Sequence, residues 1–149
     1  SKHELVFVFK NGKAKSINNI ALGMAERYRT NVWDYPSASA FSKTRNEDLA
    51  SHPTIKPVDM VADAILDASN RGEIILDPFV GSGTTIRAAD KTGRRAAAME
   101  INPAYVDLAI RRYEKATNRV IRHAGTRKPY EQIAEERGQE TKQAEGGSQ

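Results

Sequence analysis

The sequence contains no cysteine, which excludes disulfides, cysteine-ligated zinc and thiol catalysis. It also has no apolar run near the roughly 18 residues that a membrane span needs. No basic and then apolar leader of the secretory type opens it. We therefore expect no membrane partner and a cytoplasmic location, where the lack of cysteine suits a reducing environment.

Hydrophobic residues are also limited, at 39% of 149 residues, and the mean hydropathy is −0.61. This length suits one ordinary domain, and the low hydropathy indicates that part of the chain stays outside the core. Lys and Arg number 23 against 19 acids, for a net charge of +4. That balance is compatible with nucleic-acid binding but is also ordinary for a soluble domain.

What is present is an alternation of short strands and helices that is typical of an α/β fold. A strand, a glycine turn, a helix and a second strand follow one another as a βαβ unit. The pattern predicts strands at 4–9, 30–35, 73–77 and 95–99, with the strands at 4–9 and 73–77 buried, and helices from Pro57 to about residue 70, at 84–92 and at 103–117.

The last part of the chain is polar. Residues 119–149 hold six Lys or Arg and five Glu, with few large apolar residues. We expect a flexible tail there, with a short helix around Tyr130 to Arg137. The predicted division is therefore a domain at 1–118 and a tail at 119–149.

A glycine-bearing turn runs from Asp77 to Thr85, where a strand ends and a helix begins. Glycines there let backbone amides approach a ligand closely, and the helix N-terminus favours an anionic group. A Walker loop needs a lysine after the second glycine, and Thr84 stands in that place. Nucleotide hydrolysis is therefore not expected, and a plain tight turn is the alternative.

Glu100 lies 17 residues beyond Gly83, at the end of the next predicted strand. A carboxylate in this place can accept hydrogen bonds from both ribose hydroxyls. The turn and the acid together indicate a cofactor with a free ribose diol, either a dinucleotide or S-adenosylmethionine.

The segment from His52 to Pro57 precedes the first predicted helix, and its two prolines make it rigid. Thr54 can donate a hydroxyl hydrogen bond, and Lys56 can meet a carboxylate. A helix cap with a solvated lysine is the alternative.

Three runs in this order, His-Pro-Thr-Ile-Lys-Pro, Asp-Pro-Phe-Val-Gly-Ser-Gly-Thr-Thr and Met-Glu-Ile-Asn-Pro-Ala-Tyr-Val, resemble the β-group DNA amino-methyltransferases. The resemblance covers residues 2–117 and implies a Rossmann-like sheet with flanking helices. It also implies S-adenosylmethionine as cofactor and transfer of its methyl group to adenine N6 or cytosine N4. Enzymes of this family flip the target base from the duplex for DNA methylation, as in restriction–modification.

By the same resemblance, Glu100 binds the ribose, Ile101 covers a face of the adenine, and the Thr54 to Pro57 segment holds the methionine end. The glycine turn supplies the rest of the cofactor site. The full set that the resemblance implies is Thr54, Lys56, Pro57, Asp77, Phe79, Gly81, Ser82, Gly83, Thr84, Glu100 and Ile101.

The family's catalytic motif, Asp, Asn or Ser followed by Pro-Pro and an aromatic residue, is absent from this sequence. Residues 34–37 lack the Pro-Pro pair, and Asn102-Pro103 reads as a helix cap. We therefore assign no catalytic residue. We expect the C-terminal portion of such an enzyme, cut upstream of Ser1, with its catalytic strand missing. It would then be inactive unless another chain complements it. The partners that we expect beside DNA are such a complementing chain or a homo-oligomer.

Double-stranded DNA is the expected macromolecular partner. Lys10, Lys13, Lys15, Arg27, Arg29, Lys43 and Arg45 are candidates for phosphate contacts, with solvated loop charges as the alternative. Two rival functions stay open. One is a non-catalytic methyltransferase remnant that binds cofactor, DNA or a partner. The other is a dinucleotide-dependent oxidoreductase, which leaves the His52 to Pro57 segment unexplained.

Overall fold

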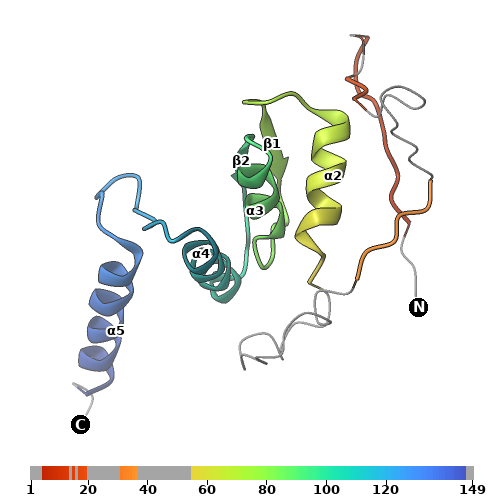
Figure 1. Cartoon of the computed structure of the whole chain (residues 1–149). Helices are drawn as coiled ribbons and strands as arrows, with labels where there is room; N and C mark the ends of the chain where they lie inside the picture. The colour runs from red at the N-terminus through yellow and green to blue at the C-terminus, as the bar shows by residue number, and fades with distance from the viewer. Residues whose placement is uncertain (1–4, 14, 16, 20–30, 37–54, 147–149) are drawn as a thin grey trace.

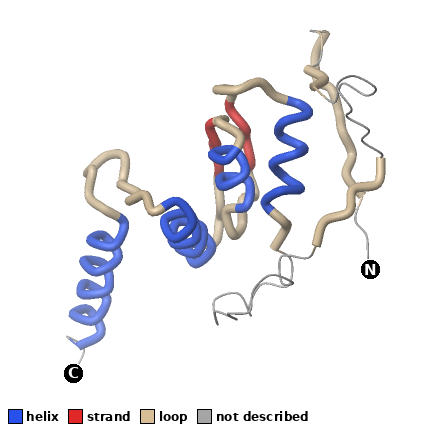
Figure 2. Tube along the Cα trace, viewed as in Figure 1, coloured by secondary structure: helices blue, strands red, loops and turns tan. Residues whose placement is uncertain are grey.

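The computed structural model describes residues 5–13, 15, 17–19, 31–36 and 55–146 (Figure 1). Helices and short strands alternate along the described chain, as Figure 2 shows. In chain order they are α2 (Val58–Ala68), β1 (Ile74–Asp77), α3 (Thr84–Lys91), β2 (Arg95–Ala98), α4 (Pro103–Thr117) and α5 (Tyr130–Gly146).

The two strands form a parallel sheet in which Ile74 pairs with Arg95 and Asp77 pairs with Ala98. Helix α3 connects them, so the predicted βαβ unit and the α/β class are confirmed. The parallel pairing places the ends of β1 and β2 side by side, and the segments that follow both strands therefore meet at one edge of the sheet.

The core lies on one face of this sheet, between the sheet and helices α2 and α3. Ala62 and Ile65 of α2 are buried against Ala88 and Ala89 of α3. Ile75 of β1 packs on this cluster. The alanines have small side chains, which lets the two helices approach each other closely beside the strands.

The opposite face of the sheet is open. Ile74 is 59% exposed and Leu76 is 68% exposed, and all four residues of β2 are exposed. The expectation of a buried strand at 73–77 was therefore wrong for this face. A run of apolar residues predicts a strand that is covered on both faces. In the described structure only the face that carries Ile75 is covered.

A polar joint fixes the end of α2 to the start of β2. The Arg94 side chain donates from Nε to Oγ of Ser69 at 3.1 Å and from Nη2 to the Ser69 carbonyl at 2.6 Å. Asn19 reaches the same helix end, where its side-chain amide donates to the carbonyls of Leu66 and Ser69 at 3.0 and 2.9 Å. Its backbone amide donates to the Asp67 carbonyl at 2.9 Å. These contacts serve helix carbonyls that have no partner inside α2.

Helix α4 begins and ends as its sequence predicts. Asn102 is the N-cap, and its side chain accepts the Ala104 amide at 3.0 Å, with Pro103 at the first helical position. At the other end Asn118 adopts the left-handed conformation, with φ of 54°. The interpretation of Asn102-Pro103 as a helix cap is confirmed.

Several predicted elements differ from the structure. Residues 5–9 form no strand and expose their apolar side chains, and residues 31–35 also form no strand. A strand needs a neighbour that accepts its backbone hydrogen bonds, and the described sheet gives these segments none. The helix expected at 130–137 is real but extends to Gly146.

The N-terminal segments lie beyond α2, whereas α5 lies at the other end of the molecule, past α4 (Figure 1). The division into a domain at 1–118 and a tail at 119–149 stays a prediction. None of the helices in the described part of the chain is long and apolar enough to cross a membrane.

Candidate functional site

The connection between β1 and α3 is a tight turn built on two glycines. Gly81 and Gly83 both have positive φ, at 52° and 82°, where a side chain would be strained. The Gly83 amide donates to the Val80 carbonyl at 3.0 Å, and the Val80 amide donates to the Met99 carbonyl at 3.1 Å. The turn is therefore closed on itself and also fastened to the end of β2.

Asp77, the last residue of β1, holds this turn from inside. Its Oδ1 accepts the Phe79 amide at 3.0 Å, and its Oδ2 accepts the Thr85 hydroxyl at 2.6 Å. One carboxylate thus joins the strand, the turn and the first turn of α3. This arrangement explains why an acid is needed at the end of β1, since both of its oxygens serve the geometry of the turn.

Glu100, which follows β2, faces the same turn. Its Oε2 accepts the Gly81 amide at 2.9 Å, and its Oε1 accepts the Asn102 amide at 2.9 Å. The carboxylate is half-buried and fixed in orientation by these two donors. Each carboxylate oxygen has two lone pairs, so both can accept a further hydrogen bond from a ligand hydroxyl.

Helix α4 supports the turn from behind. A methyl group on Gly83 would lie 2.8 Å from Cβ of Ala109, so only glycine allows this packing. Nη1 of Arg112 donates to the Ser82 carbonyl at 2.5 Å. Partial burial, and to a lesser extent the nearby Arg87, hold the pKa of the Arg112 guanidinium below its ordinary value. The guanidinium remains charged at neutral pH and fixes α4 to the turn.

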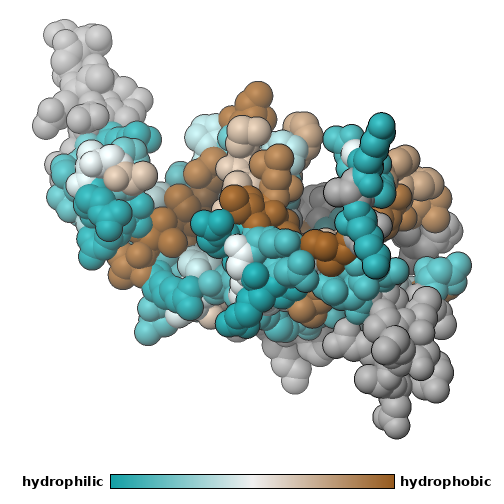
Figure 3. All heavy atoms as spheres, turned by 90° about the horizontal axis from the view of Figure 1, so that it is seen from above, coloured by the Kyte–Doolittle hydropathy of each residue, from teal (hydrophilic) through white to brown (hydrophobic). Residues whose placement is uncertain are grey.

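The mouth of the turn is flanked by apolar side chains that are fully open to solvent. Phe79 is 87% exposed and Ile101 is 98% exposed. A Cβ built on Gly81 would meet nothing within 4 Å, so the backbone there faces open space. Hydrophobic residues reach the surface among hydrophilic ones over the middle of the molecule (Figure 3). Exposed apolar groups beside fixed polar groups are typical of a ligand site.

The structure brings together most of the residues that the sequence predicted for this site. They lie at the edge of the sheet where β1 and β2 end, and they are Asp77, Phe79, Gly81, Ser82, Gly83, Thr84, Glu100 and Ile101. Lys56 and Pro57 lie at the start of α2, for which Pro57 is the N-cap. Thr54 lies outside the described residues. The functional roles of all these residues stay predictions.

Sequence reasoning did not assign three residues that shape the site: Thr85, Ala109 and Arg112. Thr85 is the second of the two threonines that end the glycine-bearing turn. Its hydroxyl, at the opposite end of this segment from Asp77, was the signal that could have identified it. Arg112 lies in the predicted helix at 103–117 and is partly buried, where a charged residue needs a partner.

This arrangement can bind a ligand with a pair of hydroxyl groups and a flat apolar portion. Glu100 offers oriented acceptors for the hydroxyls, and Phe79 and Ile101 offer exposed apolar surface. The described residues beside the turn supply positioning and hydrogen bonding, as a cofactor site requires.

Comparison with known proteins connects this chain to one family. Residues 1–111 match the N6/N4 methyltransferase family, described as DNA methylase. The DNA adenine methyltransferase YhdJ of Escherichia coli is 39% identical over 59% of this chain and 29% of its own length. The orphan methyltransferase M.BamHII of Bacillus amyloliquefaciens is 30% identical over 80% of this chain and 56% of its own.

Among solved structures, the complex of M1.HpyAVI with SAM is 29% identical, with a TM-score of 0.48. That match covers 68% of this chain and 45% of the other. The chain thus spans only part of these curated relatives. It covers 29% of the length of YhdJ and 56% of the length of M.BamHII.

Proposed function

The chain belongs to the N6/N4 DNA methylase family, and from that membership we propose that it is the S-adenosylmethionine-binding portion of a DNA amino-methyltransferase. The substrate would be the exocyclic amino group of adenine or cytosine in double-stranded DNA. A cytoplasmic location is part of this proposal.

The observation that carries the proposal is the pairing of Glu100 with the glycine turn. The acid of one strand end is joined to the Gly81 amide of the neighbouring strand end at 2.9 Å. A fixed carboxylate beside glycine amides suits a nucleoside ligand, because ribose hydroxyls can donate to it. Its negative charge also disfavours a ligand with a 2′-phosphate.

The residues present fit this cofactor. Glu100 would hold the ribose, Phe79 and Ile101 would contact the adenine, and the open backbone at Gly81 leaves room for close approach. Thr54, Lys56 and Pro57 would hold the methionine end. When bound, S-adenosylmethionine supplies a methyl group on a sulfonium, which is a good leaving group. The chain's own contribution is to bind and orient it.

We also propose that methyl transfer requires catalytic residues that this sequence does not contain, supplied by another chain. The sequence has no Pro-Pro motif of the family's catalytic type, and therefore no group of that type to accept the amino protons or stack on the flipped base. The proposal thus separates cofactor binding, which belongs to this chain, from catalysis.

Cofactor binding is tested by calorimetry with S-adenosylmethionine on the full chain and on Glu100→Ala. We expect the wild type to bind and the variant to lose about 10- to 100-fold in affinity, since hydrogen bonds to a charged acceptor are worth about 1.5–3 kcal/mol. Glu131→Ala removes an exposed acid of α5 and is the matched control, with unchanged affinity expected.

Failure of the wild type to bind, or equal binding by Glu100→Ala, would contradict the proposed cofactor site. A preference for NAD over S-adenosylmethionine would favour the oxidoreductase instead.

The proposal that this chain cannot transfer a methyl group alone is tested with labelled S-adenosylmethionine and unmethylated duplex DNA. We expect no methyl incorporation by this chain alone, and incorporation would show that the chain is catalytically complete. The non-catalytic remnant is the second candidate function, favoured by the missing motif. It would be supported by DNA or partner binding with no cofactor affinity.

A further inference from the structure

A strongly basic segment joins the last part of α4 to the start of α5. Residues 111–128 contain seven Lys or Arg and a single acid, Glu114. The rest of the chain holds sixteen Lys or Arg and eighteen Asp or Glu, so this segment carries more than the whole net charge of +4. Such a concentration of one sign of charge is typical of a surface that binds a polyanion.

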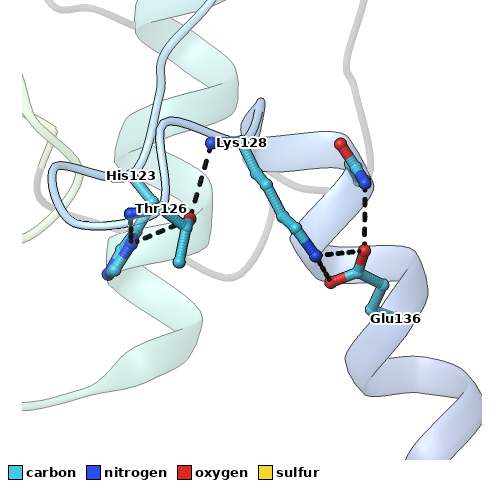
Figure 4. A network of polar contacts seen from close by, with 5 residues as sticks. His123, Thr126, Lys128 and Glu136 are labelled. Carbon is cyan, nitrogen blue, oxygen red and sulfur yellow. Dashed lines mark hydrogen bonds and ion pairs between the residues drawn. The ribbon is translucent and has the colours of Figure 1, made fainter.

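The chain beyond α4 forms a tight hairpin. Arg122 and Pro129 pair as an antiparallel bridge. The Thr126 amide donates to Nδ1 of His123 at 3.1 Å and closes the turn between them (Figure 4). We call residues 119–129 the basic hairpin. Its charges are therefore held on an ordered backbone.

Two helices hold the basic hairpin in place. The Ile121 amide donates to Oε1 of Glu114 on α4 at 2.7 Å, and Arg119 pairs with Asp90 of α3 at 2.8 Å. Asp90 is the penultimate residue of α3, a helix that leads away from the glycine turn. The basic hairpin thus lies near the far end of α3, separate from the candidate cofactor site.

Most cations of this segment are exposed. Within the basic hairpin, Lys128 pairs with Glu136 of α5 at 2.7 Å (Figure 4), and Arg119 pairs with Asp90 as described above. The Arg127 side chain makes no hydrogen bond or ion pair with the described residues. The exposed cations are Arg111, Lys115, Arg119, Arg122 and Arg127.

Arg127 also occupies an unusual backbone position. Its φ is 60°, in the left-handed region that favours glycine. Its carbonyl accepts Nη1 of Arg122 at 3.1 Å, which holds the Arg122 guanidinium against the backbone of Arg127. Arg127 is therefore a position to test by substitution with glycine.

We propose that the basic hairpin and the exposed end of α4 form a second contact surface for duplex DNA, which binds phosphates without reading sequence. This proposal rests on the proposed function, in which double-stranded DNA is the substrate. Guanidinium groups match phosphate oxygens in two-point hydrogen bonds. Helix α5 of a second copy is a weaker occupant, because its five Glu are partly offset by two Lys or Arg.

The test is DNA binding by the full chain and by a triple variant, Lys115→Gln, Arg122→Gln and Arg127→Gly. Binding of a labelled duplex is measured by fluorescence anisotropy over a series of salt concentrations. Each phosphate contact contributes about 0.9 to the slope of log K against log salt. We therefore expect the slope to fall by about 2–3 and the affinity to fall by about 10-fold or more.

A matched triple, Arg71→Gln, Lys91→Gln and Arg95→Gln, removes the same charge from exposed positions that have no predicted contact with DNA. An equal loss of DNA affinity in both variants would overturn the proposal. The affinity would then depend on the number of charges removed and not on their position. Absence of DNA binding by the wild type would also overturn it. Loss of S-adenosylmethionine binding with intact DNA binding would contradict only the proposed function.

The single variant Arg127→Gly separates binding from folding. We expect its melting temperature to stay the same or rise, because glycine tolerates this backbone, while its DNA affinity falls several-fold. A lower melting temperature would mean that Arg127 serves the fold, and would overturn the proposal. Self-association that the triple variant abolishes, with DNA affinity retained, would assign the surface to a second copy.

Discussion

Gly83 combines two separate reasons for being glycine. Its backbone has φ of 82°, and a Cβ there would lie 2.8 Å from Cβ of Ala109. Gly81 has only the first reason, since φ is 52° and nothing lies within 4 Å of an added Cβ. The two positions in one turn therefore separate backbone strain from overpacking.

We expect Gly83→Ala to lower the free energy of unfolding by about 2–4 kcal/mol, from strain and overpacking together. Gly81→Ala should cost about 1–2 kcal/mol, from strain alone. Urea unfolding measures both. Adding Ala109→Gly should restore part of the loss at position 83 and none at position 81, and equal losses at both positions would contradict the packing argument.

The sequence predicted the glycine turn and Glu100 as one site, because the order of strand, turn, helix and strand brings these residues to one edge of a parallel sheet. It did not predict the hydrogen bond between Glu100 and Gly81, or the one that the Thr85 hydroxyl donates to Asp77. Those contacts depend on loop dihedrals, which residue spacing does not determine.

At the scale of elements, the joint between α2 and β2 depends on one arginine. Arg94 donates to Ser69 twice and to the Thr92 carbonyl at 2.6 Å. These bonds satisfy carbonyls at a helix end, so the charged group connects elements that share few apolar contacts at this point.

Arg94→Met should lower the free energy of unfolding by about 2 kcal/mol, because polar groups at the joint lose their partners. The side chain of the neighbouring Arg95 is exposed, and its Nε donates at a longer distance, 3.3 Å, to the Gly72 carbonyl. Arg95→Met is therefore the control, with a change within about 0.5 kcal/mol. Thermal or urea unfolding of both variants gives the comparison, and similar losses would mean that the joint is not specific.

Elements with helical periodicity or good caps were predicted well, and isolated apolar runs were not. Helix α4 has its cap, its proline and its terminal asparagine in the sequence. Residues 5–9 have the composition of a strand, but a strand also needs a paired neighbour, and composition carries no information about that partner.

At the scale of the whole molecule, the sheet divides the apolar residues into a covered and an open set. Ile75 packs on the helical core, whereas Leu76, next in sequence, is 68% exposed on the other face. The open face gains little from burial in this chain, so we expect its apolar residues to contribute little to the free energy of unfolding.

Ile75→Ala should therefore cost about 1–2 kcal/mol of unfolding free energy, below the range for a fully buried residue because Ile75 is half-buried. Leu76→Ala should change it by no more than about 0.5 kcal/mol. Urea unfolding compares the pair. A large loss for Leu76→Ala would mean that the face is covered in solution.

The contact of Asn19 with the end of α2 closes a long chain segment, since Asn19 and Leu66 are 47 residues apart. Closing such a loop costs roughly 3 kcal/mol of chain entropy by its length dependence. The three hydrogen bonds from Asn19 to the end of α2 offset this cost by about 3 kcal/mol, at about 1 kcal/mol each. The βαβ unit, whose contacts are more local, can form before this closure and without it. We therefore expect the βαβ unit to form first and the contact of Asn19 with α2 to form last.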